Sequence, residues 1–177
     1  DSGVGTTLAH RICYGSYNDS IQSTIKACFF KKDVIRNHKE HFLQIWDTAG
    51  AERYSAIAPM YFRQADVVLI VYDTTDQNSL VRAKRWVIEV REKSPKAIIC
   101  FVGNKIDLID QEKISKDEVE RYVVEQQIEW FQTSAKTGQN IQSMFQQICK
   151  LIEDVNQEER LGIQINEKVE KVKGCCQ

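Results

Sequence analysis

Three short polar segments of the sequence have residue types that suit a phosphorylated ligand. They are residues 46–50, 104–107 and 133–136, and each follows a stretch predicted to be a β-strand. Ligands of open α/β sheets bind beyond the carboxyl ends of the strands, so we expect these segments to meet at one edge. Asp47 at such an end can hold a water of a bound Mg²⁺, and Gly50 lets a backbone N–H reach a terminal phosphate. Alone, residues 47–50 are equally typical of an Asx turn.

A glycine-containing turn near the start of the sequence has the character of a phosphate-binding loop. Gly3-Val4-Gly5-Thr6-Thr7 opens a predicted helix and resembles the end of GxxxxGK[ST], where backbone N–H groups and a helix N-terminus bind phosphates. The match is incomplete, because the first Gly of the motif would precede Asp1 and Thr6 stands at the position of its Lys. A plain glycine-rich turn is the alternative.

Residues 104–107 resemble the NKxD motif that recognises guanine. The Asp107 carboxylate would accept hydrogen bonds from the N1–H and the exocyclic amine, which adenine does not offer together. Lys105 would lie along the purine face, and Ala135 would offer its N–H to the guanine oxygen. NKxD also occurs by chance as a charged surface turn. Asp107 and the lack of an Arg-rich lid segment disfavour a third interpretation, an adenine-specific kinase.

The elements that must position these residues alternate between strand and helix. Strands are predicted by alternating or continuous apolar runs at 41–46, 67–72, 97–102 and 128–131, and helices by apolar stripes at 79–93, 116–126 and 141–155. Ser115 followed by Glu118 predicts a capping box at the second of these helices. Parallel strands need crossover connections, so the order indicates an α/β fold with helices on both faces of a mostly parallel sheet.

Composition and charge exclude several classes of function. The 177 residues correspond to about one domain, and a net charge of −1 provides no basic field for nucleic acid. The cysteines form no CxxC pair, so neither zinc nor a disulfide framework is predicted and a reducing cytosol fits best. The apolar runs are far shorter than the roughly 18 residues of a membrane span. Any membrane contact is therefore expected to be peripheral.

Taken in order and at these separations, the four segments resemble the small GTPase superfamily. The Rab branch matches best, because residues 46–54 and 58–61 are similar to its second switch, and residues 58–61 resemble its early-endosomal members in particular. The resemblance covers residues 1–156 and implies a P-loop GTPase fold. The first strand of that fold would lie before Asp1, so we expect it to be missing here, with two neighbouring strands left unpaired; a sequence record that begins late is the simpler explanation.

The resemblance implies a set of site residues. GTP or GDP would contact Ser2, Gly3, Val4, Gly5, Thr6, Thr7, Tyr17, Thr24, Asp47, Gly50, Asn104, Lys105, Asp107, Ser134, Ala135 and Lys136. Mg²⁺ would be held by Thr7, Thr24 and, through water, Asp47. Phe29, Trp46 and Tyr61 match an exposed aromatic triad that Rabs present to effectors, although three ordinary core aromatics would look the same in sequence.

Two catalytic positions depart from the family. Thr6 stands where a Lys bridges the β- and γ-phosphates, and Ala51 stands where a Gln orients the attacking water. We therefore expect weakened nucleotide affinity and slow or absent hydrolysis. Lys26 also replaces the usual Gly of the first switch, which leaves partner choice open. The alternative function is a pseudo-GTPase, an interaction module that binds effectors without turning over nucleotide.

The end of the sequence resembles a lipidation site. Residues 157–177 form a charged stretch without a core pattern and are expected to be a flexible tail. Cys175 and Cys176 resemble the double-cysteine ending on which Rabs carry two geranylgeranyl chains, and two lipids give stable anchoring. Two inert thiols are the alternative. The implied partners are effector, exchange-factor and prenylation-escort proteins, and the implied location is the cytoplasm and the cytosolic face of endosomal or other vesicle membranes.

Overall fold

The structure is a computed structural model that describes residues 3–18, 24, 27–36, 39–48 and 58–153. Its strands are β1 (Cys28–Arg36), β2 (Lys39–Asp47), β3 (Val67–Asp73), β4 (Ile98–Asn104) and β5 (Glu129–Thr133). Its helices are α1 (Val4–Tyr14), α2 (Pro59–Phe62), α3 (Gln77–Lys93), the 3₁₀ turn η2 (Ile109–Gln111), α4 (Lys116–Gln126) and a last helix over residues 141–153. Every strand and helix predicted from the sequence is present, with ends shifted by a few residues.

The strands form two sheets, one antiparallel and one parallel. β1 and β2 make an antiparallel hairpin, whereas β3, β4 and β5 are parallel in the order β3-β4-β5. Among the described residues, β2 pairs only with β1 and β3 only with β4, so both strands keep one unpaired edge.

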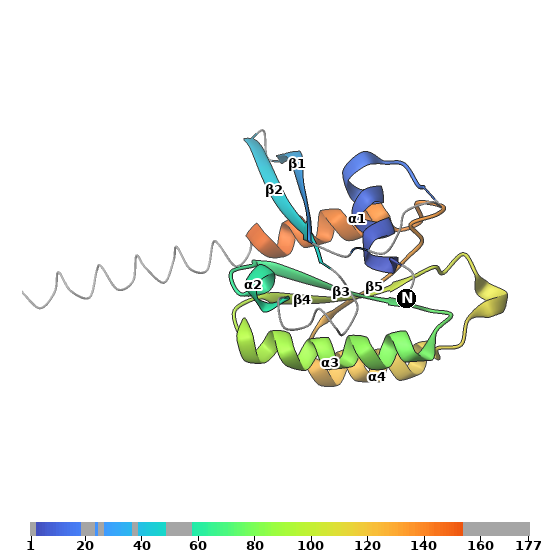
Figure 1. The fold of residues 1–177 in the computed structure, drawn as a ribbon. Coiled ribbons are helices and arrows are strands. Elements are labelled where there is room, and N and C mark those ends of the chain that lie inside the picture. Colours follow the sequence, from blue (N-terminus) through green and yellow to red (C-terminus); the bar gives the residue numbers. More distant parts are fainter. Residues whose placement is uncertain (1–2, 19–23, 25–26, 37–38, 49–57, 154–177) are drawn as a thin grey trace, which may run out of the picture.

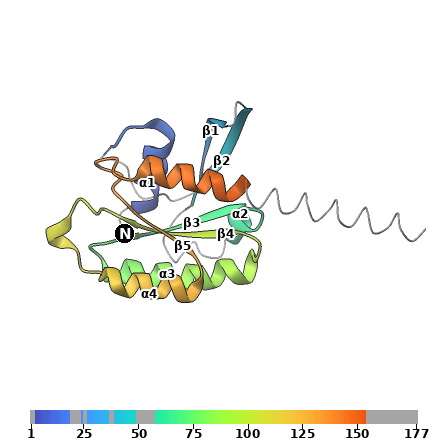
Figure 2. The ribbon, with the colours of Figure 1, turned by 180° about the vertical axis from the view of Figure 1, so that it is seen from behind.

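Helices cover both faces of the parallel sheet (Figures 1 and 2). On one face, α3 and α4 pack against Ile70, Tyr72 and Phe101 through residues such as Leu80 and Val87. The opposite face is covered by α1 and the last helix, whose buried side chains are Leu8, Ile12, Ile141, Met144 and Ile148. Burial of such side chains stabilises the fold by about 1.5–3 kcal/mol each. The predicted α/β class is therefore confirmed.

The starts of α3 and α4 use different caps. At α3 the Asp76 carboxylate accepts a hydrogen bond from the Asn78 N–H at 2.9 Å. Ser115 is the N-cap of α4 as predicted, but its side chain makes no capping hydrogen bond, so the predicted capping box is wrong. Glu118 instead lies 2.7 Å from the Lys84 ammonium on α3. A contact between helices replaces the local one.

β1 was not predicted, because a lysine interrupts its alternation. Over residues 29–34 the side chains alternate between exposed and half-buried: Phe29, Lys31 and Asp33 are exposed, and the three others face inward. Lys32 falls on the inward face, where its ammonium lies 5.7 Å from the centroid of the Phe145 ring. The long methylene stem and this cation–π contact allow a charged residue to occupy an inward position.

Gly103 on β4 leaves room for a buried aromatic ring. A Cβ at this position would lie 2.6 Å from Tyr72 Oη and 2.8 Å from Tyr72 Cζ. Tyr72 is 1% exposed, and its hydroxyl accepts a hydrogen bond from Trp130 Nε1 at 3.1 Å. We predict that Gly103→Ala lowers the free energy of unfolding by about 1–3 kcal/mol, measured by urea denaturation.

The cost of this substitution should come from the clash with Tyr72 alone. In a Tyr72→Leu background, which removes the ring, Gly103→Ala should therefore cost markedly less. An equal loss of unfolding free energy in both backgrounds would rule out the clash as the cause.

Candidate functional site

Asn104 joins three segments of the candidate site. It is the last residue of β4 and is 1% exposed. Its Oδ1 accepts a hydrogen bond from the Ala135 N–H at 2.9 Å, and its Nδ2 donates to the Val4 carbonyl at 3.3 Å. These bonds connect the loop after β4 to the loop after β5 and to the glycine-containing turn that opens α1. The structure therefore brings together three of the four segments singled out in the sequence.

A second contact orients the carboxylate expected to recognise the base. Ser134 Oγ donates to Asp107 Oδ1 at 2.6 Å, and Ser134 Oγ itself accepts from the Thr137 N–H at 3.0 Å. Ser134 is fully buried and Asp107 is partly exposed. A carboxylate offers about four lone-pair sites, so one bond from Ser134 leaves capacity for two more donors. Asp107 is thus fixed in direction and open to a ligand.

Oxygen atoms from three segments converge at the carboxyl end of β2. Thr24 Oγ1 donates to Asp47 Oδ2 at 2.7 Å, and the hydroxyl oxygens of Thr6 and Thr24 are 2.7 Å apart. Hydroxyl and carboxylate oxygens are ligands that Mg²⁺ accepts, so this donor set fits that cation. The Thr7 hydroxyl, expected to be a further ligand, donates to the Val4 carbonyl at 3.1 Å.

Burial acts on the carboxyl group of this cluster. Asp47 is 8% exposed, and burial raises its pKa above the ordinary value, although hydrogen bonds from Thr24 and Thr6 oppose the shift. A buried carboxylate is more costly to ionise without a nearby positive charge. A bound cation would supply that charge.

The start of α1 is arranged for an anion. Its N-cap is Gly3, which makes no side-chain hydrogen bond to the first turn. The N–H groups of a first helical turn lack partners within the helix and carry a partial positive charge. A Cβ at Gly5 would lie 3.8 Å from Asp47 Oδ1, so this turn borders the oxygen cluster. Phosphate and cation sites would therefore adjoin.

The predicted aromatic triad forms one contiguous cluster of tilted rings. The ring centroids of Phe29 and Trp46 are 4.9 Å apart, and those of Trp46 and Tyr61 are 5.5 Å apart. Phe29 is 49% exposed and Trp46 is 48% exposed, so neither is a core residue. Tyr61 is half-buried. A contiguous aromatic patch with two exposed members is typical of a protein-binding surface.

The structure says less about the remaining predicted site residues. Tyr17 is half-buried after α1, and Lys136 is exposed after β5. Ser2, Gly50, Ala51, Cys175 and Cys176 lie outside the described residues, as do Lys26 and the predicted tail, residues 157–177. Their roles stay predictions.

Sequence reasoning missed Asp73, which lies beside the predicted base site. Its Oδ2 is 2.6 Å from Lys105 Nζ. The signal was available, because Asp73 directly follows the apolar run 67–72 just as Asp47 follows its own strand.

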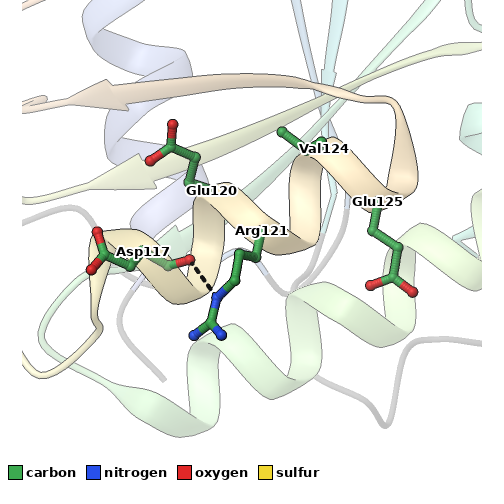
Figure 3. Close-up of a pocket in the computed structure, with 5 residues that line it drawn as sticks. All are labelled: Asp117, Glu120, Arg121, Val124 and Glu125. Carbon is green, nitrogen blue, oxygen red and sulfur yellow. Dashed lines mark hydrogen bonds between the residues drawn. The ribbon is translucent and has the colours of Figure 1, made fainter.

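A hollow elsewhere on the surface contains none of the predicted site residues. It is lined by Asp117, Glu120, Arg121, Val124 and Glu125, all from α4. Figure 3 shows these side chains fanning out from the helix, with Arg121 Nε bonded to the Asp117 carbonyl at 3.2 Å. The arrangement presents no converging polar groups.

The described part of the chain has neither a membrane-spanning helix nor a cluster of acidic, His and Cys metal ligands. None of its helices combines the length and the apolar character needed to cross a membrane. Within the same part, His, Cys, Asp and Glu side chains form no cluster of three or more that would hold a metal.

Comparison with known proteins gives a consistent family. Residues 1–154 match the profile of the Ras family. The Ras-related protein Rab5 of Nicotiana tabacum is 41% identical over 152 residues, 85% of this chain and 76% of the relative. Ras-related protein Rab-5A of Dictyostelium discoideum is 40% identical over 152 residues, with the same coverage. GTP-binding protein ypt5 of Schizosaccharomyces pombe is 40% identical over 154 residues, 85% of this chain and 73% of the relative.

Proposed function

Because the chain belongs to the Ras family of small GTPases, we propose that it is a Rab-like switch that binds GDP and GTP with Mg²⁺ in endosomal vesicle transport. The observation that carries the proposal is the fixed Asp107 carboxylate, joined through the loops of Asn104 and Ala135 to the turn at Val4. In this proposal, the carboxylate that recognises guanine and the helix N-terminus that binds phosphate lie at the same edge of the sheet and are connected by hydrogen bonds.

Each part of the nucleotide has a candidate partner at this edge. Asp107 accepts the two guanine donors, and the Ala135 backbone lies beside it. The first turn of α1 binds the phosphates through its N–H groups. Thr7, Thr24 and, through water, Asp47 would hold Mg²⁺, and the cation when bound would offset the charge of the phosphate oxygens. On loss of the terminal phosphate, the two segments that resemble the family's switches, around Thr24 and at residues 46–54, would relax.

The departures at Thr6 and Ala51 weaken this switch. The Thr6 hydroxyl carries no charge and is 2.7 Å from the Thr24 hydroxyl, so it cannot replace a phosphate-binding ammonium. Ala51 has no side-chain polar atom to orient water. The second candidate, a pseudo-GTPase that acts through the Phe29–Trp46–Tyr61 cluster, is favoured by these two residues. Both candidates use this cluster to bind effectors.

Restoring the polar side chain at position 51 should restore hydrolysis. We predict that Ala51→Gln raises the single-turnover rate of phosphate release from GTP by roughly a hundredfold, since a positioned polar group that assists the attacking water contributes about that much. Ala51→Leu, which adds bulk without a polar atom, is the matched control and should leave the rate low. Equal rates of phosphate release for the two variants would show that the side chain at position 51 takes no part in hydrolysis.

The cellular role follows from the tail and the relatives. Two geranylgeranyl chains on Cys175 and Cys176 would anchor the protein on the cytosolic face of endosomal membranes. Prenylation-escort and exchange factors would be its further partners. Mass spectrometry of the protein from cells tests this: a thioether-linked lipid on both cysteines is expected, and unmodified thiols would contradict it.

The nucleotide bound to the purified protein distinguishes the two candidate functions. After denaturation, a switch should release GDP or GTP that chromatography identifies. Absence of both, together with no uptake at micromolar guanine nucleotide and Mg²⁺, would favour the pseudo-GTPase. Bound GTP without any phosphate release would indicate a locked switch.

A further inference from the structure

The last residue of β3 reaches into the predicted base site. Asp73 pairs in register with Asn104, the residue before Lys105. Its side chain is 7% exposed, and its Oδ2 lies 2.6 Å from Lys105 Nζ. A nearly buried carboxylate therefore contacts the lysine whose methylenes are predicted to lie along the purine face.

The Asp73 carboxylate is itself held from other sides. Its Oδ1 accepts from the Thr75 N–H at 2.9 Å and from the Thr75 hydroxyl at 2.7 Å. The Asp73 N–H donates to Ser79 Oγ at 2.8 Å. Burial raises the pKa of Asp73, but hydrogen bonds from Lys105 and Thr75 and the Lys105 charge outweigh burial and hold it below its usual value. Asp73 is therefore an ionised, oriented anchor at neutral pH.

Lys105 is thus fixed at both of its ends. Its backbone has a φ of 72°, in the left-handed region that residues other than glycine seldom adopt. Asn104, bonded to Ala135 and Val4, holds the backbone on one side, and the Lys105 carbonyl accepts from the Leu108 N–H at 3.0 Å. With the ammonium on Asp73, the four-carbon stem between these points has little freedom.

We infer that Asp73 is a positioning residue for the purine base, because its carboxylate holds the Lys105 stem in place as one wall of the base site. This inference rests on the proposed function. Asp73 touches no ligand itself; it removes rotamer freedom from Lys105 before the nucleotide arrives, which is the usual advantage of preorganisation.

The test is the rate at which fluorescently labelled GDP dissociates in the presence of Mg²⁺. Asp73→Asn keeps the size of the side chain and loses the charge, so dissociation should be about tenfold faster, the change expected for one charge-assisted hydrogen bond. Asp76→Asn is the matched control, since Asp76 caps α3 and pairs with Arg82. The control rate should stay within about twofold of the wild type.

A variant background that lacks the Lys105 ammonium distinguishes a positioning role of Asp73 from a general loss of structure. Lys105→Met keeps an unbranched stem without the ammonium, and in this background Asp73→Asn should add no further increase. Additive effects of the two substitutions, or an Asp73→Asn rate equal to the wild type, would overturn the inference while the proposed function stands. A wild-type protein that retains no GDP would overturn both.

A milder variant keeps the inference testable if Asp73→Asn does not fold. Thr75→Val removes one hydrogen bond from the same carboxylate, and a rise of about twofold to fivefold in GDP dissociation is expected. The rise should vanish in the Lys105→Met background; a rise that persists there would contradict the role given to Asp73.

Discussion

Asp107→Asn should lower the affinity for GDP by at least about a hundredfold and convert the preference from guanine to xanthine nucleotides. A site built to hydrogen-bond a particular group rejects ligands that leave its polar atoms unpaired, by factors of 10⁴ or more in the strongest cases. Asn keeps an acceptor for the Ser134 hydroxyl, now 2.6 Å from Asp107 Oδ1, so the loop should keep its shape. Its amide donor then faces the guanine donors and suits the second oxygen of xanthine.

Asp110→Asn provides the control for this change. Asp110 lies in η2, three positions further along, and is exposed. Loss of the same formal charge there should leave the affinities for GDP and for xanthosine diphosphate unchanged, as measured by equilibrium titration. Should Asp107→Asn leave the base preference unaltered, Asp107 would not be the guanine-recognising group.

Thr6→Lys should raise the affinity for GTP by about tenfold to a hundredfold. A hydrogen bond to a charged group contributes about 1.5–3 kcal/mol, and each 1.4 kcal/mol corresponds to a factor of ten. Thr6 is half-buried in the first turn of α1 and borders the oxygen cluster of Thr24 and Asp47, so an ammonium there would face the phosphates. Titration of GTP into nucleotide-free protein with Mg²⁺ measures the change.

Thr6→Met separates the charge from the loss of the hydroxyl. Both substitutions remove the contact between Thr6 and Thr24, and both add a long side chain, but only Lys adds a positive charge. We expect the Met variant to bind GTP no better than the wild type. Equal GTP affinities of the Lys and Met variants would show that a positive charge at position 6 does not contribute to phosphate binding.

Much of the site could be predicted because polar residues at strand ends are a local signal. Asp47, Asn104 and Thr133 each end a strand, as the apolar runs before them indicated. What could not be predicted depends on how distant segments pack. The contact of Thr6 with Thr24 depends on how two segments that are 18 residues apart in the sequence pack together, and the sequence does not indicate this packing.

The errors in the predicted fold also come from contacts between distant segments. The capping box at α4 was predicted from spacing alone, but Glu118 is engaged by Lys84 of a neighbouring helix. β1 was missed because Lys32 occupies an inward position, where its ammonium meets the ring of Phe145 from a distant part of the chain. Asp73 is different, since its position at the end of a strand could have identified it as a site residue. Its pairing with Lys105 could not be predicted from the sequence.

The most direct test of this account is a titration of the full-length protein with GDP and with ADP, each with Mg²⁺. The account predicts saturable GDP binding that is at least about a hundredfold tighter than ADP binding, because only guanine offers the paired donors that Asp107 accepts. Equal affinity for the two nucleotides, or no binding of GDP at all, would contradict it.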